Sequence, residues 1–291
     1  MKKRKKRTME DIIFDFVVYT VLILISLCCF LPVWHVAMAA FSTTSDISAA
    51  NGLILWVKKI DFGALKLVFQ DDSLMIGFKN TLLYLAGSLP INIILTVMAG
   101  YFLSCTGMMW KKIIAGMITF TMFFCGGMIP NYLNIRDLGL MDSLWALILT
   151  GALSVYNAMI CKTSIEAIPD SLRESAYIDG ANDFQIIFKI ILPLIKATIA
   201  VLILYYGVGH WNSWFSASIY IRDADKLPLQ NALRYILLAN QTNELDTDSF
   251  NAYAETIKYA AIVISSAPIM CIYPFLQKYF TKGALIGAVK G

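Results

Sequence analysis

The chain has 291 residues, of which 58% are hydrophobic and only 15% are charged. Soluble domains average roughly 45–50% apolar and 25% charged residues, so this composition excludes an ordinary soluble domain and indicates a protein of the lipid bilayer. The net charge of +4 is modest and comes largely from residues 2–7, which are all Lys or Arg. Such a cluster beside an apolar segment predicts a cytosolic anchor on anionic lipid headgroups, in preference to nucleic-acid binding.

The six cysteines and two histidines give no pattern of a metal or redox site. The cysteines lie within or at the ends of apolar segments and form no CxxC motif or Cys/His cluster. We expect them to pack as small apolar residues. His35 and His210 are far apart in the chain and are expected at the membrane interface.

The first apolar segment, residues 12–40, contains Ala37-Met38-Ala39, which fits the small-x-small pattern of a signal-peptide cleavage site. A signal-peptide core has roughly 7–15 apolar residues, and this segment is longer. We therefore predict an uncleaved first membrane span.

Six apolar segments have the length of a membrane-spanning helix, which needs about 20 mostly apolar residues. They are approximately residues 12–40, 78–105, 113–132, 144–161, 191–215 and 257–276. The predicted fold is all-α and polytopic, with six transmembrane helices. Its predicted parts are a basic cytosolic N-terminus at residues 1–11, a six-helix transmembrane domain at 12–276 and a cytosolic C-terminal tail at 277–291.

The distribution of Lys and Arg predicts that both termini lie inside. Membrane proteins keep cationic loops on the cytosolic side, and with the N-terminus inside the inner segments hold the larger share of the 24 cations. The outer loops, residues 42–77 and 218–256, contain many Asp and Glu residues. They can meet a partner outside or act only as solvated connections.

The longest inner loop, residues 162–190, carries the most specific pattern. Ser171 and Glu174 have the spacing of an S-x-x-E capping box, which predicts the start of a short helix. Gly180 is predicted to end that helix, because glycine readily takes the left-handed conformation.

A second short helix is predicted directly after the first. Asn182 or Asp183 can cap it, and it leads into the fifth span. Pro193 is expected to kink that span or to mark its entry. The two short helices thus form an elbow on the cytosolic side.

The elbow resembles the signature loop of the permeases of ABC importers, written E-A-A, three residues, G, nine residues, I-x-L-P. The matching positions here are Glu174, Ser175, Ala176, Gly180, Ile190, Leu192 and Pro193. The spacing agrees throughout, and Ser175 in place of the first alanine is the one departure. Ordinary capping of a loop would explain Ser171 and Glu174 but not the Ile-x-Leu-Pro register.

This resemblance implies a role for the elbow. In the family, the first short helix sits in a groove of the ATPase subunit and transmits its closure to the membrane helices. Carried over, Glu174 is the anionic contact to the ATPase, Ala176 the small contact residue and Gly180 the hinge. The implied mechanism is alternating access driven by ATP on other subunits.

Further resemblances narrow the family to carbohydrate-type importers, the group of the smaller membrane subunit of the maltose transporter. They lie at the start of span two, after span three and in the tail: residues 80–82, 128–133, 138–140, 277–280 and 287–291. In some relatives the tail reaches the ATPase interface, which implies a contact by Lys290 and Gly291.

The resemblance also implies the partners and the place of the protein in the cell. They are a second, homologous permease subunit, two cytosolic nucleotide-binding subunits, an extracytoplasmic solute-binding protein and membrane lipid. The sequence has no G-x-x-x-x-G-K-[ST] phosphate cradle, so ATP and Mg²⁺ are expected on the partner subunits and no cofactor on this chain. The expected location is the prokaryotic cell membrane, in multi-pass form.

The cargo is expected to be a sugar, most simply an oligosaccharide. Aromatic and amide side chains that suit sugars occur at Asn157 in span four and at Tyr205, Tyr206, Trp211 and Asn212 near the end of span five. An aromatic membrane belt and helix packing are the alternative uses of these residues. In the related maltose system the partner membrane subunit holds most of the sugar.

Three other functions are the alternatives. A permease of the same superfamily for an amino acid, a peptide or phosphate would keep the mechanism and change only the cargo. A proton- or sodium-driven secondary transporter should carry intramembrane acids or broken helices, and no acid lies mid-span in the predicted segments. A membrane enzyme would need a clustered set of His, Cys or carboxylate side chains, which the sequence lacks.

Overall fold

The computed structural model describes residues 8–50, 52–105, 107, 109–242, 255–272 and 274. All regular secondary structure in these residues is helical. By length and composition, three helices can cross a membrane, or up to six spans exist if each of three bent helix pairs is one span. The predicted all-helical membrane protein is confirmed, with up to six spans.

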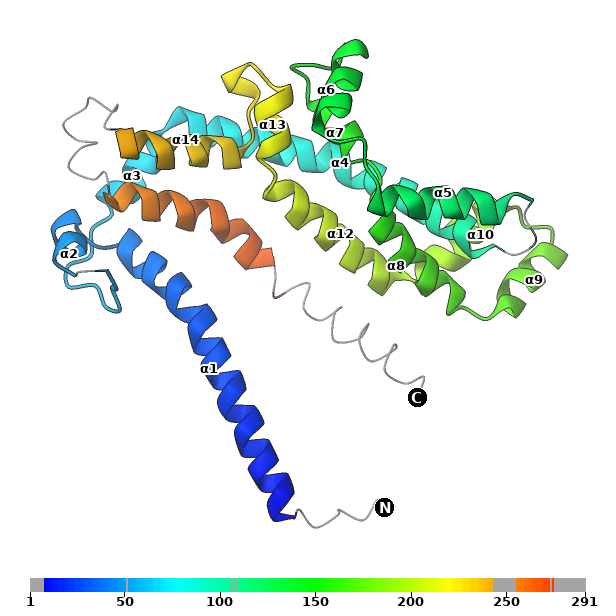
Figure 1. Ribbon diagram of the computed structural model, residues 1–291, viewed down its shortest axis with the longest axis horizontal. Helices are drawn as coiled ribbons and strands as arrows, with labels where there is room; N and C mark the ends of the chain where they lie inside the picture. Colours follow the sequence, from blue (N-terminus) through cyan, green and yellow to red (C-terminus); the bar gives the residue numbers. More distant parts are fainter. Residues whose placement is uncertain are drawn as a thin grey trace. The chain divides into compact units, whose positions relative to one another are not determined.

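The helices follow one another along the chain as labelled in Figure 1. They are α1 (Met9–Ala40), α2 (Thr44–Ala49), α3 (Gly63–Gln70), α4 (Asp72–Ser104), α5 (Lys111–Phe123), α6 (Met128–Asp137), α7 (Leu144–Thr150), α8 (Val155–Glu166), α9 (Asp170–Ile178), α10 (Asp183–Ile186), the π-helix η1 (Ile187–Ile191), α11 (Leu192–Leu194), α12 (Lys196–Trp211), α13 (Phe215–Tyr220), the 3-10 helix η2 (Ala224–Lys226) and α14 (Leu229–Thr242). A last helix, Glu255–Ile272, carries no label.

Three of the predicted spans are single helices: α1, α4 and Glu255–Ile272. The prediction of one continuous helix is wrong for the third span, residues 113–132. There α5 ends at Phe123, and α6 leaves at 112° to it. Gly126 and Gly127 fill the gap, and glycine is a poor helix former. Pro130 then fits the first turn of α6, where no N–H is required.

Continuous helices are also wrong for the fourth and fifth spans. α7 and α8 meet at 50°, with residues 151–154 non-helical between them. In the fifth span, Asp183–Leu194 meets Lys196–Trp211 at 86°. The break follows Pro193, which has no N–H and crowds the carbonyl four residues earlier.

The chain divides into two compact units, residues 1–71 with 236–265 and residues 72–235 with 266–291. In the first unit, the end of α1 is fixed by hydrogen bonds to the following loop: the Trp34 indole donates to the Leu55 carbonyl at 2.9 Å, and the Ile54 amide donates to His35 Nδ1 at 3.0 Å. The His35 ring also meets Tyr259 edge to face.

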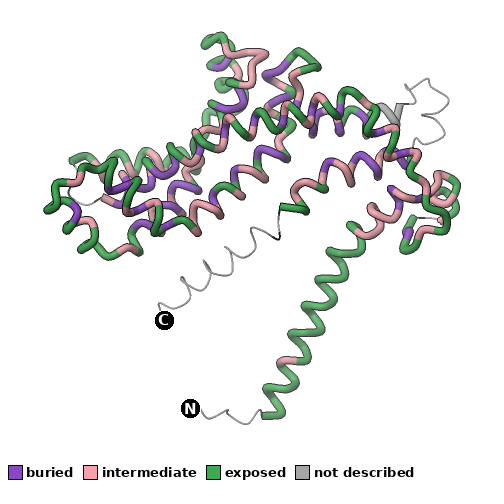
Figure 2. Tube along the Cα trace, turned by 180° about the vertical axis from the view of Figure 1, so that it is seen from behind, coloured by how far each residue is buried: buried purple, intermediate pink, exposed green. Residues whose placement is uncertain are grey.

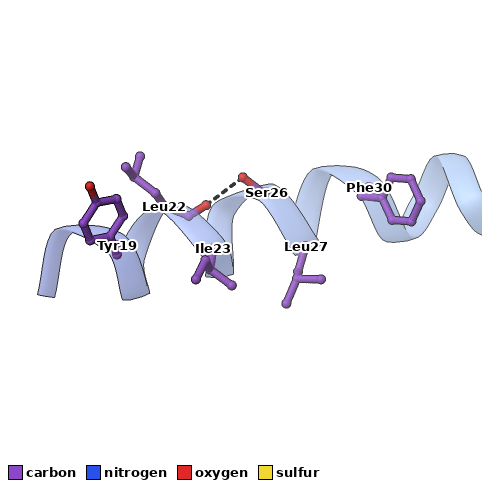
Figure 3. Close-up of a pocket in the computed structure, with 6 residues that line it drawn as sticks. All are labelled: Tyr19, Leu22, Ile23, Ser26, Leu27 and Phe30. Carbon is purple, nitrogen blue, oxygen red and sulfur yellow. Dashed lines mark hydrogen bonds between the residues drawn. The ribbon is translucent and has the colours of Figure 1, made fainter. Parts of the chain in front are cut away.

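Most of α1 is uncovered, as the exposed colouring along the helix in Figure 2 shows. Six of its side chains follow one face at helical spacing and line a shallow apolar groove (Figure 3). They are Tyr19, Leu22, Ile23, Ser26, Leu27 and Phe30. The Ser26 hydroxyl donates to the Leu22 carbonyl at 2.7 Å, so it is satisfied within the helix. This span can therefore face lipid or another membrane helix.

In the second unit, α4 packs along α8 and α12, as Figure 1 shows. At Gly100 the approach of α4 to α8 is so close that a Cβ atom would lie 2.9 Å from the Cys161 sulfur. Cys161 is fully buried there, as expected of a small packing residue, whereas Cys28, Cys29, Cys125 and Cys271 are exposed. Small residues at such points let membrane helices approach closely.

The break in the fourth span frees backbone groups that α7 and α8 cannot pair. The hydrocarbon core offers no water to such groups, so the protein must bond them internally. The Asn92 side chain of α4 donates to the carbonyls of Gly151 and Ala152, at 2.7 and 2.9 Å. Asn92 is fully buried, so it replaces water at the break.

His210 of α12 fixes the orientation of Asn92. Since the Asn92 amide nitrogen faces the carbonyls, its oxygen lies 2.8 Å from His210 Nε2, which therefore carries the ring proton. Nδ1 then accepts from the Tyr84 hydroxyl, also at 2.8 Å. His210 is only 9% exposed, so it is part of the packed interior of the second unit.

Tyr206 of α12 completes this network. Its hydroxyl accepts from the Ser154 amide at 2.9 Å and lies 2.7 Å from Thr96 Oγ1. Four polar residues of α4 follow one another every four residues, a spacing that puts them on one helix face: Tyr84, Ser88, Asn92 and Thr96. All four are buried, and Tyr84, Asn92 and Thr96 belong to the network.

Replacing Asn92 by Leu is expected to leave the carbonyls of Gly151 and Ala152 and the N–H of His210 without partners. The loss of stability should be about 1–2 kcal/mol. Thermal unfolding of the purified protein in detergent measures it, with Asn131→Leu as control because Asn131 lies exposed on α6. Equal melting temperatures of the two variants would contradict the account.

Candidate functional site

The elbow, here α9 to α11, is rooted in the second unit by a buried apolar cluster. Ala176 of α9 and Ile186, Ile187 and Ile191 of the next turns join residues of α4, α8 and α12 in this cluster. Each of these four side chains is at most 7% exposed. The elbow is thus part of a packed core rather than a loose loop.

The first helix of the elbow starts at Asp170, two residues before the start that a capping box of Ser171 and Glu174 requires. Pro169 is its N-cap and makes no side-chain cap bond, so the predicted box of Ser171 and Glu174 is wrong. Asp170, in the first turn, pairs with Arg173 instead. Ser171 lies within the helix, and its carbonyl accepts from the Ser175 hydroxyl at 2.8 Å.

The predicted end of that helix at Gly180 is confirmed. Gly180 has a φ of +80°. Its amide donates to the Tyr177 carbonyl and the Ala181 amide donates to the Ala176 carbonyl, at 3.0 and 2.9 Å. These two bonds are those of a Schellman motif.

Of the two residues predicted to cap the next helix, Asn182 is the N-cap, and the helix begins at Asp183. The Asn182 side chain accepts from the Gln185 amide at 2.9 Å, and the Gln185 side chain accepts from the Asn182 amide at 3.0 Å. The chain then widens into the π-helix η1, in which the Leu192 amide donates to the carbonyl of Ile187, five residues back. This wide turn accommodates Pro193, which has no N–H to give.

Three polar side chains join the elbow to the inner end of α4. The Asp183 Oδ1 atom accepts from the Tyr101 hydroxyl at 2.6 Å and from the Tyr177 hydroxyl at 2.5 Å. The two hydroxyl oxygens are 3.1 Å apart. These bonds hold the pKa of Asp183 below its usual value, so the carboxylate stays charged at neutral pH.

The opposite side of the elbow is exposed and apolar. Ile178 is 86% exposed and Phe184 65% exposed, and Leu172 and Phe188 are also exposed. Glu174 lies exposed on the same short helix as Ile178. The other matched positions, Ile190 and Leu192, are half-buried, and Pro193 is exposed.

The residues considered for sugar contact do not share one environment. Tyr206 and Trp211 are buried in the packing of the chain itself, Tyr206 in the network described above and Trp211 edge to face with Phe78. Asn157 is 5% exposed on α8. Tyr205 and Asn212 are exposed. The tail residues Lys290 and Gly291 and the basic residues 2–7 lie outside the described part of the chain.

Asp142 joins two loops of the second unit that are predicted to lie outside. Its carboxylate accepts from the amides of Arg222 and Asp223, at 3.1 and 3.0 Å, and from Lys226 Nζ at 2.9 Å. The Asp223 amide first, and then Lys226, lower the pKa of Asp142 to about 2. This linkage is therefore present above the usual carboxyl pKa of about 4 and lost only as the pH falls toward 2.

Residues 80–285 match the family described as binding-protein-dependent transport system inner membrane component. The chain belongs to this family. It is accordingly a multi-pass permease of the bacterial inner membrane and not the catalytic subunit of its transport system. The broken spans, which were expected of a secondary transporter, are therefore compatible with an ABC permease.

Among curated proteins, the chain is 36% identical to the polygalacturonan/rhamnogalacturonan transport system permease protein YtcP of Bacillus subtilis, over 97% of this chain and all of that protein. It is also 36% identical to protein LplC of the same organism, over 90% and 89% of the two chains. Among solved structures, a bacterial ABC transporter that imports the acidic polysaccharide alginate matches with a TM-score of 0.86 and 30% identity, over 95% of this chain and 99% of that one. The predicted resemblance to carbohydrate importers is confirmed.

Replacing Gly180 by Val should strain the end of α9, because a β-branched residue at positive φ costs about 1–2 kcal/mol. The amides of residues 180 and 181 should then exchange hydrogen about tenfold faster, as mass spectrometry can measure. Gly180→Asn is the control, since Asn tolerates this conformation and no atom lies within 4 Å of the added Cβ. Equal exchange in both variants would contradict the assignment.

Proposed function

We propose that the elbow couples this permease to two cytosolic nucleotide-binding subunits, which bind ATP and Mg²⁺ and drive alternating access. The observation that carries the proposal is the two-sided construction of the elbow. One side is buried in a core shared with α4, α8 and α12, and the other exposes Ile178 and Phe184. When a partner that binds the exposed side moves, the buried side can transmit this movement to the three membrane helices that it packs against.

The chemistry of the exposed side supports a protein partner. Large apolar side chains that project from an aqueous loop lose water-exposed area when a partner covers them. Glu174 lies near them and adds a charge that a cationic residue of the ATPase can pair with. Ala176 is buried, so we infer that it packs the elbow against the membrane helices and does not contact the ATPase directly.

The remaining partners follow from the same assembly. A second, homologous permease subunit would complete the membrane pathway, and the uncovered α1 offers it an apolar surface. A solute-binding protein would dock on the outer loops, whose second-unit part Asp142 holds together. The tail contact of Lys290 and Gly291 with the ATPase stays a prediction.

The proposed cargo is an oligosaccharide, and the similarity to YtcP and to the alginate importer makes acidic oligosaccharides the first to test. Tyr205 and Asn212 are the proposed contacts at the pathway, since both are exposed near the end of α12. An aromatic ring and an amide suit the C–H faces and hydroxyls of a sugar.

Purification of the tagged chain from its native membrane tests the proposal. A nucleotide-binding subunit and a second membrane subunit should co-elute, and vesicles that hold the complex should take up oligosaccharide only with ATP and the binding protein. Elution of the chain alone from intact membranes, or uptake without ATP, would overturn the proposal.

Ile178→Asp should weaken binding of the ATPase, because a charge would be buried against an apolar groove. Loss of a contact at the centre of an interface costs about 2 kcal/mol or more, so the amount of co-eluting ATPase should fall by more than tenfold. Leu138→Asp is the control, since Leu138 is also largely exposed but follows α6, on the side predicted to be outside. Equal ATPase recovery with both variants would contradict the docking surface.

A further inference from the structure

The elbow is joined by the chain to only two spans. Its first helix follows α8, the end of the fourth span, and its last turn leads into α12 of the fifth. α4, the second span, is remote in sequence. Any movement of the elbow therefore reaches α4 only through non-covalent contacts.

Two kinds of contact connect α4 to the elbow. The first is apolar: Val97 and Tyr101 share the buried cluster with Ala176 and Ile186. The second is polar: the Tyr101 hydroxyl donates to Asp183 Oδ1, and its oxygen lies 3.1 Å from that of Tyr177, which donates to the same Asp183 atom. Within the described residues the Tyr101–Asp183 bond is the hydrogen bond between α4 and the elbow. Apolar surfaces can slide past one another, whereas a hydrogen bond to a charged group is short and directional.

We propose that Tyr101, Tyr177 and Asp183 form a clasp that makes α4 follow the elbow during transport. This inference rests on the proposed function. Tyr101 is the member on the membrane helix, and the residue is only 7% exposed, so its position is fixed by packing. Asp183 and Tyr177 both lie on the elbow and present one carboxylate oxygen and one hydroxyl to it.

The two bonds to Asp183 can be removed one at a time, which allows a coupling role to be distinguished from a structural one. The Tyr101–Asp183 bond crosses from α4 to the elbow, whereas the Tyr177–Asp183 bond lies within the elbow. Removing the Tyr101 hydroxyl therefore cuts the crossing link and leaves the internal one. Removing the Tyr177 hydroxyl cuts the bond within the elbow and leaves the Tyr101–Asp183 bond in place.

The experiment compares Tyr101→Phe, Tyr177→Phe and wild type in the complete transporter, reconstituted in vesicles with its binding protein. Both variants keep the ring and lose one oxygen. Tyr156→Phe is a third variant and the control, because Tyr156 is 55% exposed on α8 and makes no hydrogen bond within the described residues. The readouts are the number of solute molecules taken up per ATP hydrolysed and the melting temperature of the complex.

For Tyr101→Phe, uptake per ATP should fall by about fivefold or more, the lower end of ordinary coupling between sites, while ATP hydrolysis continues. Tyr177→Phe should lose clearly less, and Tyr156→Phe should match wild type. Unchanged uptake per ATP in Tyr101→Phe would overturn the clasp alone. Equal losses in Tyr101→Phe and Tyr177→Phe, matched by equal falls in melting temperature, would assign the three residues a structural role only. A wild-type complex without ATP-driven uptake would overturn the proposed function as well.

Discussion

Each backbone group that a broken span frees must find a partner inside the protein, because the hydrocarbon core supplies none. In the fourth span, the Asn92 side chain donates to the freed carbonyls of Gly151 and Ala152, and the Tyr206 hydroxyl accepts from the freed amide of Ser154. These side chains come from α4 and α12, so satisfying the break also ties three helices together. The packing of the second unit depends on this requirement.

The same helices carry the root of the elbow. At their inner ends the requirement is met differently, since water can reach the loop. A Schellman motif closes α9 at Gly180, a capping box opens α10 at Asn182, and a π turn absorbs Pro193. With its backbone satisfied and one face buried, the elbow can keep its shape while its exposed side chains, among them Ile178, meet another protein.

Sequence patterns predicted the elements whose cause is local. The six apolar segments, the stop at Gly180 and the start at Asn182 each depend on a few neighbouring residues, and the structure agrees. The predicted capping box at Ser171 is wrong because the helix starts two residues earlier, with Pro169 as N-cap and the Asp170–Arg173 pair in its first turn. The breaks within spans were missed because apolar composition continues through them. The bonds of His210 to Tyr84 and Asn92 could not be predicted because these partners lie far away in sequence, although the four-residue spacing of polar residues in α4 indicates a buried face.

The central claim is that the elbow faces the cytosol and is covered there by the ATPase. Labelling of an Ile178→Cys variant with a membrane-impermeant maleimide, in sealed vesicles of known orientation and relative to the parent chain with its six cysteines, measures both parts of the claim. The account predicts labelling from the cytosolic side only, with protection when the nucleotide-binding subunits are bound. Labelling from the outside, or the same rate with and without those subunits, would contradict it.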